Sequence, residues 1–180
     1  MSPDDSVATL KRDDPEVGHL VGELDLAGSM LVEDAASLIT ELRADLTVMT
    51  ARGFLSEATQ QGYRVLLCRL GEGEHRQCAA LAGFRVLSTS RGKILMLEDL
   101  IVARRWRGRG LGAVMLAHVR SRAQQEACVR VELDTGNENR RAQRLYTSSG
   151  FEAIAVHFAA ATAQPGPTVQ PSALFRKTGD

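Results

Sequence analysis

Apolar residues recur at changing intervals along the chain, and these intervals predict its helices and strands. Residues 1–17 carry charges and prolines without an apolar period, so we predict a mobile leader there and a single domain over 18–180. Gly62 is expected to end the last helix of the first third of the chain. The elements predicted before it are a strand at 20–26, a helix with apolar positions from Ala35 to Met49, and a helix at 51–61.

Between residues 63 and 103 the period is that of a sheet. Three runs rich in Val and Leu are separated by polar turns, which is typical of an antiparallel meander. From here to the C-terminus the predicted elements are strands at 63–70, 78–88 and 93–103, a helix from Leu111, a strand at 129–133, a helix at 139–149, and strands at 151–158 and 173–177. The predicted class is α+β, with one parallel crossover at 94–134.

Composition then narrows the kind of protein. The chain has 180 residues, 44% of them apolar, which is enough for one buried core. Its formal net charge is zero, which argues against a nucleic-acid partner and against a polybasic membrane tether. No run reaches the roughly 18 apolar residues that a membrane-spanning helix needs, and the N-terminus lacks an apolar signal core. We therefore predict a cytoplasmic protein with no nucleic-acid or membrane partner.

Cysteines and histidines show no pattern of metal ligands. Cys68, Cys78 and Cys128 are odd in number and widely separated, so neither a disulfide framework nor a CxxC site is predicted. The four histidines lack ligand spacing. We predict buried structural thiols and no metal.

A glycine-rich loop, Arg-Gly-Arg-Gly-Leu-Gly at 107–112, lies between a predicted strand and a predicted helix. Backbone N–H groups and the helix dipole form an anion site at such a junction, and four nearby arginines (104, 105, 107 and 109) favour a ligand with several negative charges. The loop lacks the G-K-[ST] ending of a kinase or ATPase P-loop. A dinucleotide site remains an alternative, because Gly108, Gly110 and Ala113 fit G-x-G-x-x-A and Glu132 follows at ribose-binding distance.

The chain resembles the GNAT superfamily of acetyl-CoA-dependent N-acetyltransferases. The family signature [QR]-x-x-G-x-[GA] is met by Arg107, Gly110 and Gly112. The strand Leu-Glu-Asp-Leu-Ile-Val at 97–102 is similar to that of spermidine/spermine-type enzymes. The resemblance covers about residues 78–158. A second element, N-x-x-A-x-x-L-Y-x-x-x-G-F, is met by Asn139, Ala142, Leu145, Tyr146, Gly150 and Phe151.

This resemblance implies a GNAT fold, in which a mostly antiparallel mixed sheet is flanked by helices and splayed between its fourth and fifth strands, here 94–103 and 129–134. Acetyl-CoA, the implied cosubstrate, fills the gap. Asn139 is expected to contact the pantetheine end. The other implied cofactor contacts are the backbone of Leu100, Ile101 and Val102 and the amides of Arg107, Gly108, Arg109, Gly110, Leu111 and Gly112.

The implied activity is transfer of the acetyl group to a primary amine by direct attack in a ternary complex. An alkylammonium must lose a proton before attack, and Glu98 or Asp99 is the candidate base. Successive strand residues face opposite sides, so only one should enter the cleft unless a bulge intervenes; likeness to the polyamine enzymes favours Glu98. The resemblance makes Tyr146 the general acid for the departing thiolate. The expected oxyanion donor is a backbone N–H of the splayed strand, that of Leu100 or a neighbour.

Acidic residues of the two N-terminal helices favour a small cationic acceptor. Residues 1–60 hold 12 acidic and 4 basic residues, a net charge of −8 that the rest of the chain balances. A polyamine, an aminoglycoside-like amine or a basic peptide N-terminus all fit this charge, and so does a merely solvated helix face. A homodimer remains open. The acids concerned are Glu33, Asp34, Glu41, Asp45 and Glu57.

Three alternatives to this mechanism are kept. One is a dinucleotide-dependent oxidoreductase, and another is a non-catalytic module that senses acetyl-CoA. The third is an acetyl-cysteine intermediate on Cys128, although no neighbour in the sequence would activate that thiol.

Overall fold

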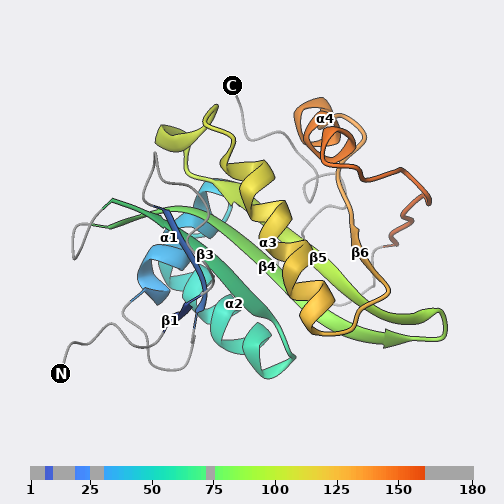
Figure 1. Ribbon diagram of the computed structural model, residues 1–180. Coiled ribbons are helices and arrows are strands. Elements are labelled where there is room, and N and C mark those ends of the chain that lie inside the picture. Colours follow the sequence, from blue (N-terminus) through green and yellow to red (C-terminus); the bar gives the residue numbers. More distant parts are fainter. Residues whose placement is uncertain (1–6, 10–18, 25–30, 72–75, 161–180) are drawn as a thin grey trace. The chain divides into compact units, whose positions relative to one another are not determined.

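The computed structural model describes residues 7–9, 19–24, 31–71 and 76–160 (Figure 1). The chain divides into two compact units, Met1–Leu133 and Asp134–Asp180. No helix among the described residues is long and apolar enough to cross a membrane.

The described residues of the first unit form one sheet of six strands that follow one another in chain order. Neighbouring strands are antiparallel throughout, except that the last pairs with its neighbour in parallel. The α+β class and the mostly antiparallel mixed sheet are therefore confirmed. The strands are β1 (Val7–Thr9), β2 (His19–Leu24), β3 (Arg64–Leu70), β4 (Gln77–Thr89), β5 (Gly92–Val102) and β6 (Arg130–Leu133).

Helices cover both faces of this sheet (Figure 1). Helix α3 (Leu111–Gln125) crosses one face and buries Met115, Leu116 and Val119 there. Helices α1 (Val32–Leu42) and α2 (Val48–Gln60) pack on the other face, where Leu55 and Ile39 join the alternate residues of β3, β4 and β5 in one core cluster. The buried β-strands thus separate two apolar layers.

Two predictions for the N-terminal part were wrong. Val7–Thr9 lie inside the predicted leader, but they form β1 because the outer backbone edge of β2 offers them a hydrogen-bonding partner. The predicted helix from Ala35 to Met49 ends at Leu42, and a new helix begins at Val48. Thr47 and Thr50 form a capping box there, which supplies partners for backbone N–H groups and so favours a helix start.

β5 carries a bulge at Glu98. The register with β4 runs Gly83↔Asp99 and then Phe84↔Leu97, so Glu98 is the extra residue. β6 pairs with β5 over four residues, and this pairing stops at Leu97↔Leu133. Among the described residues of the first unit, 98–102 therefore have a strand partner on the β4 side alone. The fourth and fifth predicted strands are β5 and β6, and their pairing ends after Leu97. This separation is what the predicted splay requires.

The second unit contains α4 (Arg140–Ser148). The strand predicted at 151–158 is not formed: those residues are irregular, and Ile154, Val156 and Phe158 are largely exposed. Alternating apolar residues favour a strand only where a neighbouring strand accepts their hydrogen bonds, and the described part of this unit supplies none. The strand predicted at 173–177 lies outside the described residues.

Candidate functional site

The loop between β5 and α3 takes the shape that its glycines allow. After Val102 a short 3₁₀ turn, η2 (Arg104–Trp106), leads to Gly108 and Gly110, whose φ angles are +79° and +77°. A residue with a Cβ is strained in this left-handed region, whereas glycine is not. Gly110 is also the N-cap of α3, so the left-handed turn leads directly into the first turn of that helix.

Backbone N–H groups of this loop are free to bind a ligand. Among the described residues, none of the five consecutive amides from Gly108 to Gly112 donates to a protein acceptor; the first amide of α3 that does is that of Ala113, to the Gly110 carbonyl at 2.9 Å. The positive end of the α3 dipole lies at the same place. Such an arrangement binds anions, and phosphate groups in particular.

Arginines surround the loop, and an indole holds two of them. The guanidinium groups of Arg105 and Arg109 lie 5.9 and 4.8 Å from the centre of the Trp106 ring. Arg107 is half-buried, and its Nε donates to the Val102 carbonyl at 3.0 Å. Sequence reasoning did not single out Trp106, although an aromatic residue among four arginines could have drawn attention to it.

The bulge places both candidate acids on the face that α1 and α2 cover. Asp99 accepts a hydrogen bond from the Tyr63 hydroxyl, and Glu98 pairs with Arg85, whose guanidinium lies 5.3 Å from the centre of the same Tyr63 ring. Without a bulge, neighbouring strand residues point to opposite faces. The exception that the sequence analysis allowed for is therefore the arrangement observed.

Asp99 is buried, with 6% of its surface exposed, and is held at both oxygens. Its Oδ2 accepts from the Tyr63 hydroxyl at 2.9 Å, and its Oδ1 accepts from Nη2 of Arg43 at 3.1 Å. Burial, followed by the nearby Asp99 charge, raises the pKa of Tyr63 well above its usual range, so this phenol stays protonated and donates. Asp99 is thus built into the core as a paired carboxylate.

Glu98 is more exposed than Asp99, and in the described part of the chain its carboxylate pairs with Arg85 alone. Burial raises the pKa of Glu98, and Asp99 adds to this, while Arg85 opposes it. A base works best when its pKa approaches the working pH. With its exposed position and raised pKa, Glu98 suits proton acceptance, whereas Asp99 is buried and held at both oxygens.

The free edge of β5 presents alternate backbone groups. The Ala103 N–H donates to the Ala79 carbonyl, and so points toward β4. Since backbone groups alternate in direction along an antiparallel strand, those of Ile101 also point toward β4, and those of Leu100 and Val102 point to the open edge. Leu100 and Val102 can therefore meet a ligand through backbone bonds, whereas the backbone of Ile101 faces β4 and its side chain is buried in the core cluster.

Asn139 and Tyr146 belong to the second unit, on α4. Asn139 is the N-cap, with its Oδ1 accepting from the Ala142 N–H at 3.2 Å. Tyr146 is half-buried against Phe151, with ring centres 6.0 Å apart, and burial raises its pKa. The helix ends through Gly150, with φ of +77°, and the Phe151 N–H donates to the Tyr146 carbonyl. The second sequence motif is thus one capped helix.

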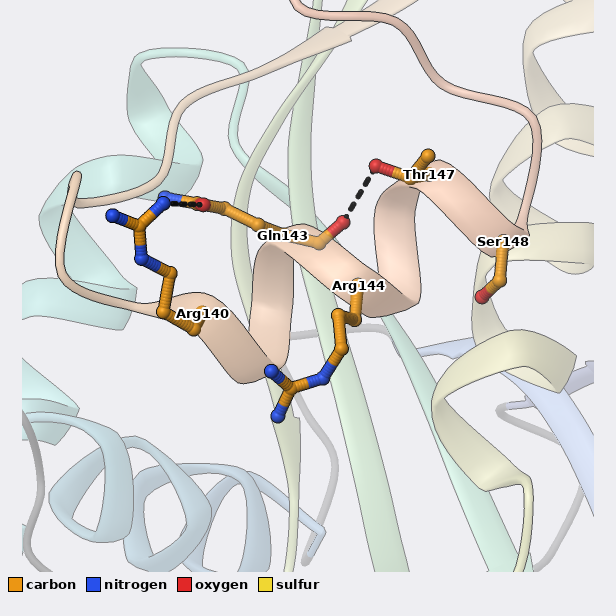
Figure 2. A pocket seen from close by; sticks show the side chains of 5 residues that line it. All are labelled: Arg140, Gln143, Arg144, Thr147 and Ser148. Carbon is orange, nitrogen blue, oxygen red and sulfur yellow. Dashed lines mark hydrogen bonds between the residues drawn. The ribbon is translucent and has the colours of Figure 1, made fainter.

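The α4 surface also bears a hollow of about 620 Å³ lined by five of its polar side chains (Figure 2). Within it, Arg140 donates to the Gln143 side chain at 3.3 Å, and the Thr147 hydroxyl donates to the Gln143 carbonyl at 2.9 Å. These bonds run along the helix itself, and Arg144 points away from them (Figure 2). Among the described residues, only helix α4 lines this hollow.

The acids expected to attract a cation are mostly paired within the first unit. Glu33 pairs with Arg52, the Glu41 carboxylate accepts from the Arg104 N–H at 2.8 Å, and Asp34 accepts from the Cys78 thiol at 3.2 Å. A pocket of about 540 Å³ opens between α1, the start of β4 and η2, and its lining mixes these acids with arginines: Asp34, Ser37, Leu38, Glu41, Arg76, Gln77, Cys78, Ala103, Arg104 and Arg105. Its lining is thus mixed in charge rather than acidic.

The cysteines do not form a reactive or metal-binding group in the described part of the chain, where no cluster of His, Cys, Asp and Glu could hold a metal ion. Cys68 and Cys78 are buried, as predicted, and burial raises the pKa of Cys68 to about 11. Cys128 is half-buried, and burial raises its pKa also. A raised pKa lowers the thiolate fraction and opposes the acetyl-cysteine route.

Residues 33–151 match the acetyltransferase (GNAT) family. A search of curated proteins found no match. Solved structures with a similar fold include the aminoglycoside N-acetyltransferase AAC(6')-Iy in complex with CoA, 15% identical, with a TM-score of 0.69 over 82% of this chain and 97% of that one. A Trypanosoma brucei acetyltransferase is 16% identical, with a TM-score of 0.63 over 80% and 99%.

A third similar structure is aminoglycoside antibiotic 6'-N-acetyltransferase AAC(6')-Ih from Acinetobacter baumannii. It is 18% identical, and its TM-score is 0.63 over 81% of this chain and 100% of that one. At these identities the likeness concerns the fold.

Proposed function

The chain belongs to the acetyltransferase (GNAT) family, and we propose that it transfers the acetyl group of acetyl-CoA to a primary amine by direct attack. The observation that carries this proposal is that the five amides of 108–112, in the loop after the strand that carries Glu98 and Asp99, have no acceptor among the described residues. Acetyl-CoA then places its pyrophosphate on these amides and its pantetheine chain along Leu100 and Val102. The acyl carbonyl accepts from the Leu100 N–H.

The proposed reaction uses residues in separate roles. Glu98, through a water molecule, takes one proton from the ammonium form of the acceptor. The neutral nitrogen forms a bond to the thioester carbon, the carbon–sulfur bond breaks, and the product nitrogen releases its excess proton to solvent. Tyr146 protonates the departing thiolate and regains its proton from solvent. Asn139 contacts the pantetheine end of the cosubstrate through its side-chain amide nitrogen, since its Oδ1 caps α4.

We propose a small cationic amine as the acceptor. Support comes from the acidic N-terminal helices and from two structurally similar aminoglycoside N-acetyltransferases. Against a general electrostatic attraction stand the pairs that Glu33 and Glu41 make within the chain. The acceptor panel should therefore include polyamines, aminoglycosides, a basic peptide N-terminus and a neutral alkylamine of matched length.

Turnover with this panel, followed by release of free thiol, tests the function directly. We expect thiol release that depends on the amine, and we expect Tyr146→Phe to lower turnover at least tenfold while binding coenzyme A normally. Thiol release with none of the amines, despite tight coenzyme A binding, would support the sensor alternative. Unchanged turnover in Tyr146→Phe would remove that residue from the mechanism.

The dinucleotide alternative is tested by thermal shift. Only β5 and β6 are parallel among the described strands, whereas that fold needs several parallel strands around its glycine motif. We expect coenzyme A to raise the melting temperature and NAD(P) to leave it unchanged. The opposite result would overturn the acetyltransferase proposal.

A further inference from the structure

Arg85 is a charged residue of β4 that the proposed reaction has not used. Its side chain is held at three points. The guanidinium lies over the Tyr63 ring, 5.3 Å from its centre; Nε donates to the Gln61 carbonyl at 3.2 Å; and Nη1 donates to the Glu98 carboxylate. A surface arginine that merely balances charge seldom has two further anchors, because fixing its side chain costs rotamer entropy.

The position of Tyr63 makes this arrangement rigid. Tyr63 is 1% exposed, its ring packs edge-on against Phe54, and its hydroxyl donates to Asp99. Its phenol lies directly over Gly83, where an added Cβ would stand only 1.6 Å from the hydroxyl oxygen. The platform under Arg85 therefore cannot move without disturbing the core.

We propose that Arg85 is a positioning residue for the base: anchored on Tyr63 and the Gln61 carbonyl, it fixes the Glu98 carboxylate on the α1–α2 face of the bulge, ready to accept the acceptor's proton. This inference rests on the proposed acetyl transfer and adds a residue to it. Glu98 projects from an irregular point of β5, and among the described residues its side chain pairs only with Arg85, so this pair sets the direction of its carboxylate.

The charges around Glu98 predict how its titration responds. The described charged and titratable groups nearby are Arg85 on β4, Asp99 on β5, Tyr63 before β3, and Arg43 beyond α1, which pairs with Asp99. Arg85 lowers the pKa of Glu98, and Asp99 raises it. Removing Arg85 should therefore move the acidic limb of the pH profile of kcat/KM to higher pH, because more of the base is protonated at a given pH.

The test compares Arg85→Met with Arg85→Lys and with Arg91→Met, a matched change at the exposed tip of the same hairpin. Methionine retains an apolar stem over Tyr63, and circular dichroism checks that each variant is folded. We expect Arg85→Met to shift the acidic limb upward by about half a pH unit or more, the scale of one partly exposed charge pair. Arg85→Lys, which keeps the positive charge, should leave the acidic limb close to its wild-type position, and Arg91→Met should not move it. An unshifted limb in Arg85→Met overturns the proposal.

A second measurement does not depend on turnover. Carboxyl NMR of the free protein, with Glu98→Gln used to assign the signal, follows the titration of Glu98 directly. Arg85→Met should raise its midpoint and Asp99→Asn should lower it. If no amine is acetylated yet these shifts occur, the role of Arg85 stands and the proposed function fails. If the amines are acetylated at a normal rate and the midpoint in Arg85→Met equals that of the wild type, the proposed function stands and the role of Arg85 fails.

Discussion

The bulge at Glu98 lies within β5 and the glycine-rich loop at 107–112 follows that strand, yet the two regions are built in opposite ways. In the loop, the backbone amides of Gly108 to Gly112 have no partner within the described residues. At the bulge, both carboxylates are paired, and each partner comes from another element of the fold. The loop is thus an open region, whose backbone amides are available to a ligand, and the bulge is a closed region, whose side chains are paired with one another.

This difference shows which of the two sites can be altered by substitutions nearby in the sequence without disturbing the rest of the fold. A backbone anion site depends on the φ angles of Gly108 and Gly110, which neighbouring residues can satisfy alone. A paired carboxylate depends on packing at a distance, since Tyr63 and Arg43 lie 36 and 56 residues from Asp99. Changes at the loop should therefore affect cofactor binding more than folding, and changes at the bulge should affect folding first.

The largest effect is expected from Gly83→Ala, which breaks the closed region. The new Cβ would lie 1.6 Å from the Tyr63 hydroxyl oxygen and 2.2 Å from the ring carbon that bears it. We expect the free energy of unfolding to fall by about 3 kcal/mol or more, measured by urea denaturation. Gly53→Ala is the control: it lies on the exposed side of α2 with open space around it, and it should stabilise by about 0.5–1 kcal/mol. A loss at Gly83 below about 1 kcal/mol would contradict the packing argument.

Gly110→Ala breaks the open region. Nothing lies within 4 Å of the added Cβ, so the cost comes from the left-handed φ of +77°, about 1–2 kcal/mol. The loop can relieve this strain only by moving its amides, so we expect coenzyme A to bind at least tenfold more weakly by calorimetry. Gly53→Ala again serves as control. Unchanged affinity in a folded Gly110→Ala protein would show that the loop amides do not carry the cofactor.

Tyr63→Phe sharpens the contrast, because it keeps the ring under Arg85 and removes only the hydrogen bond to Asp99. A buried hydrogen bond to a charged group contributes about 1.5–3 kcal/mol, and we expect a loss in that range by urea denaturation. Coenzyme A affinity should stay within about twofold of wild type. If Tyr63→Phe weakened coenzyme A binding without lowering the free energy of unfolding, the bulge would serve cofactor binding rather than folding, contrary to our assignment.

Trp106→Leu should give the smallest effect. The indole holds Arg105 and Arg109, and each exposed cation–π contact contributes about 0.5–1 kcal/mol. We expect coenzyme A to bind about two- to fivefold more weakly, with a reduced dependence of affinity on salt. Arg91→Met, which removes a charge remote from the loop, is the control. Arg91→Met should leave the affinity unchanged, and an unchanged affinity in Trp106→Leu as well would show that the indole does not position Arg105 and Arg109 for the cofactor.

Much of the fold followed from periodicity, and the failures have a common cause. Sequence patterns located β3, β4, β5, α3 and α4 within a few residues. The helix predicted through Met49 failed because apolar spacing continued by chance across the turn at 43–47. The strand predicted at 151–158 failed because a strand needs a partner, and alternation alone does not supply one.

The sequence by itself determined the glycine-rich loop at 107–112. Its glycines and arginines are adjacent in the chain, and local backbone geometry is enough to assemble them. Only the tertiary structure decided the state of the two acids: the bulge that turns Glu98 and Asp99 to one face is a mismatch between two strands, and a mismatch is a property of the pair. Tyr63 and Arg85 carry no motif, so their roles arise when the folded chain places them beside these carboxylates.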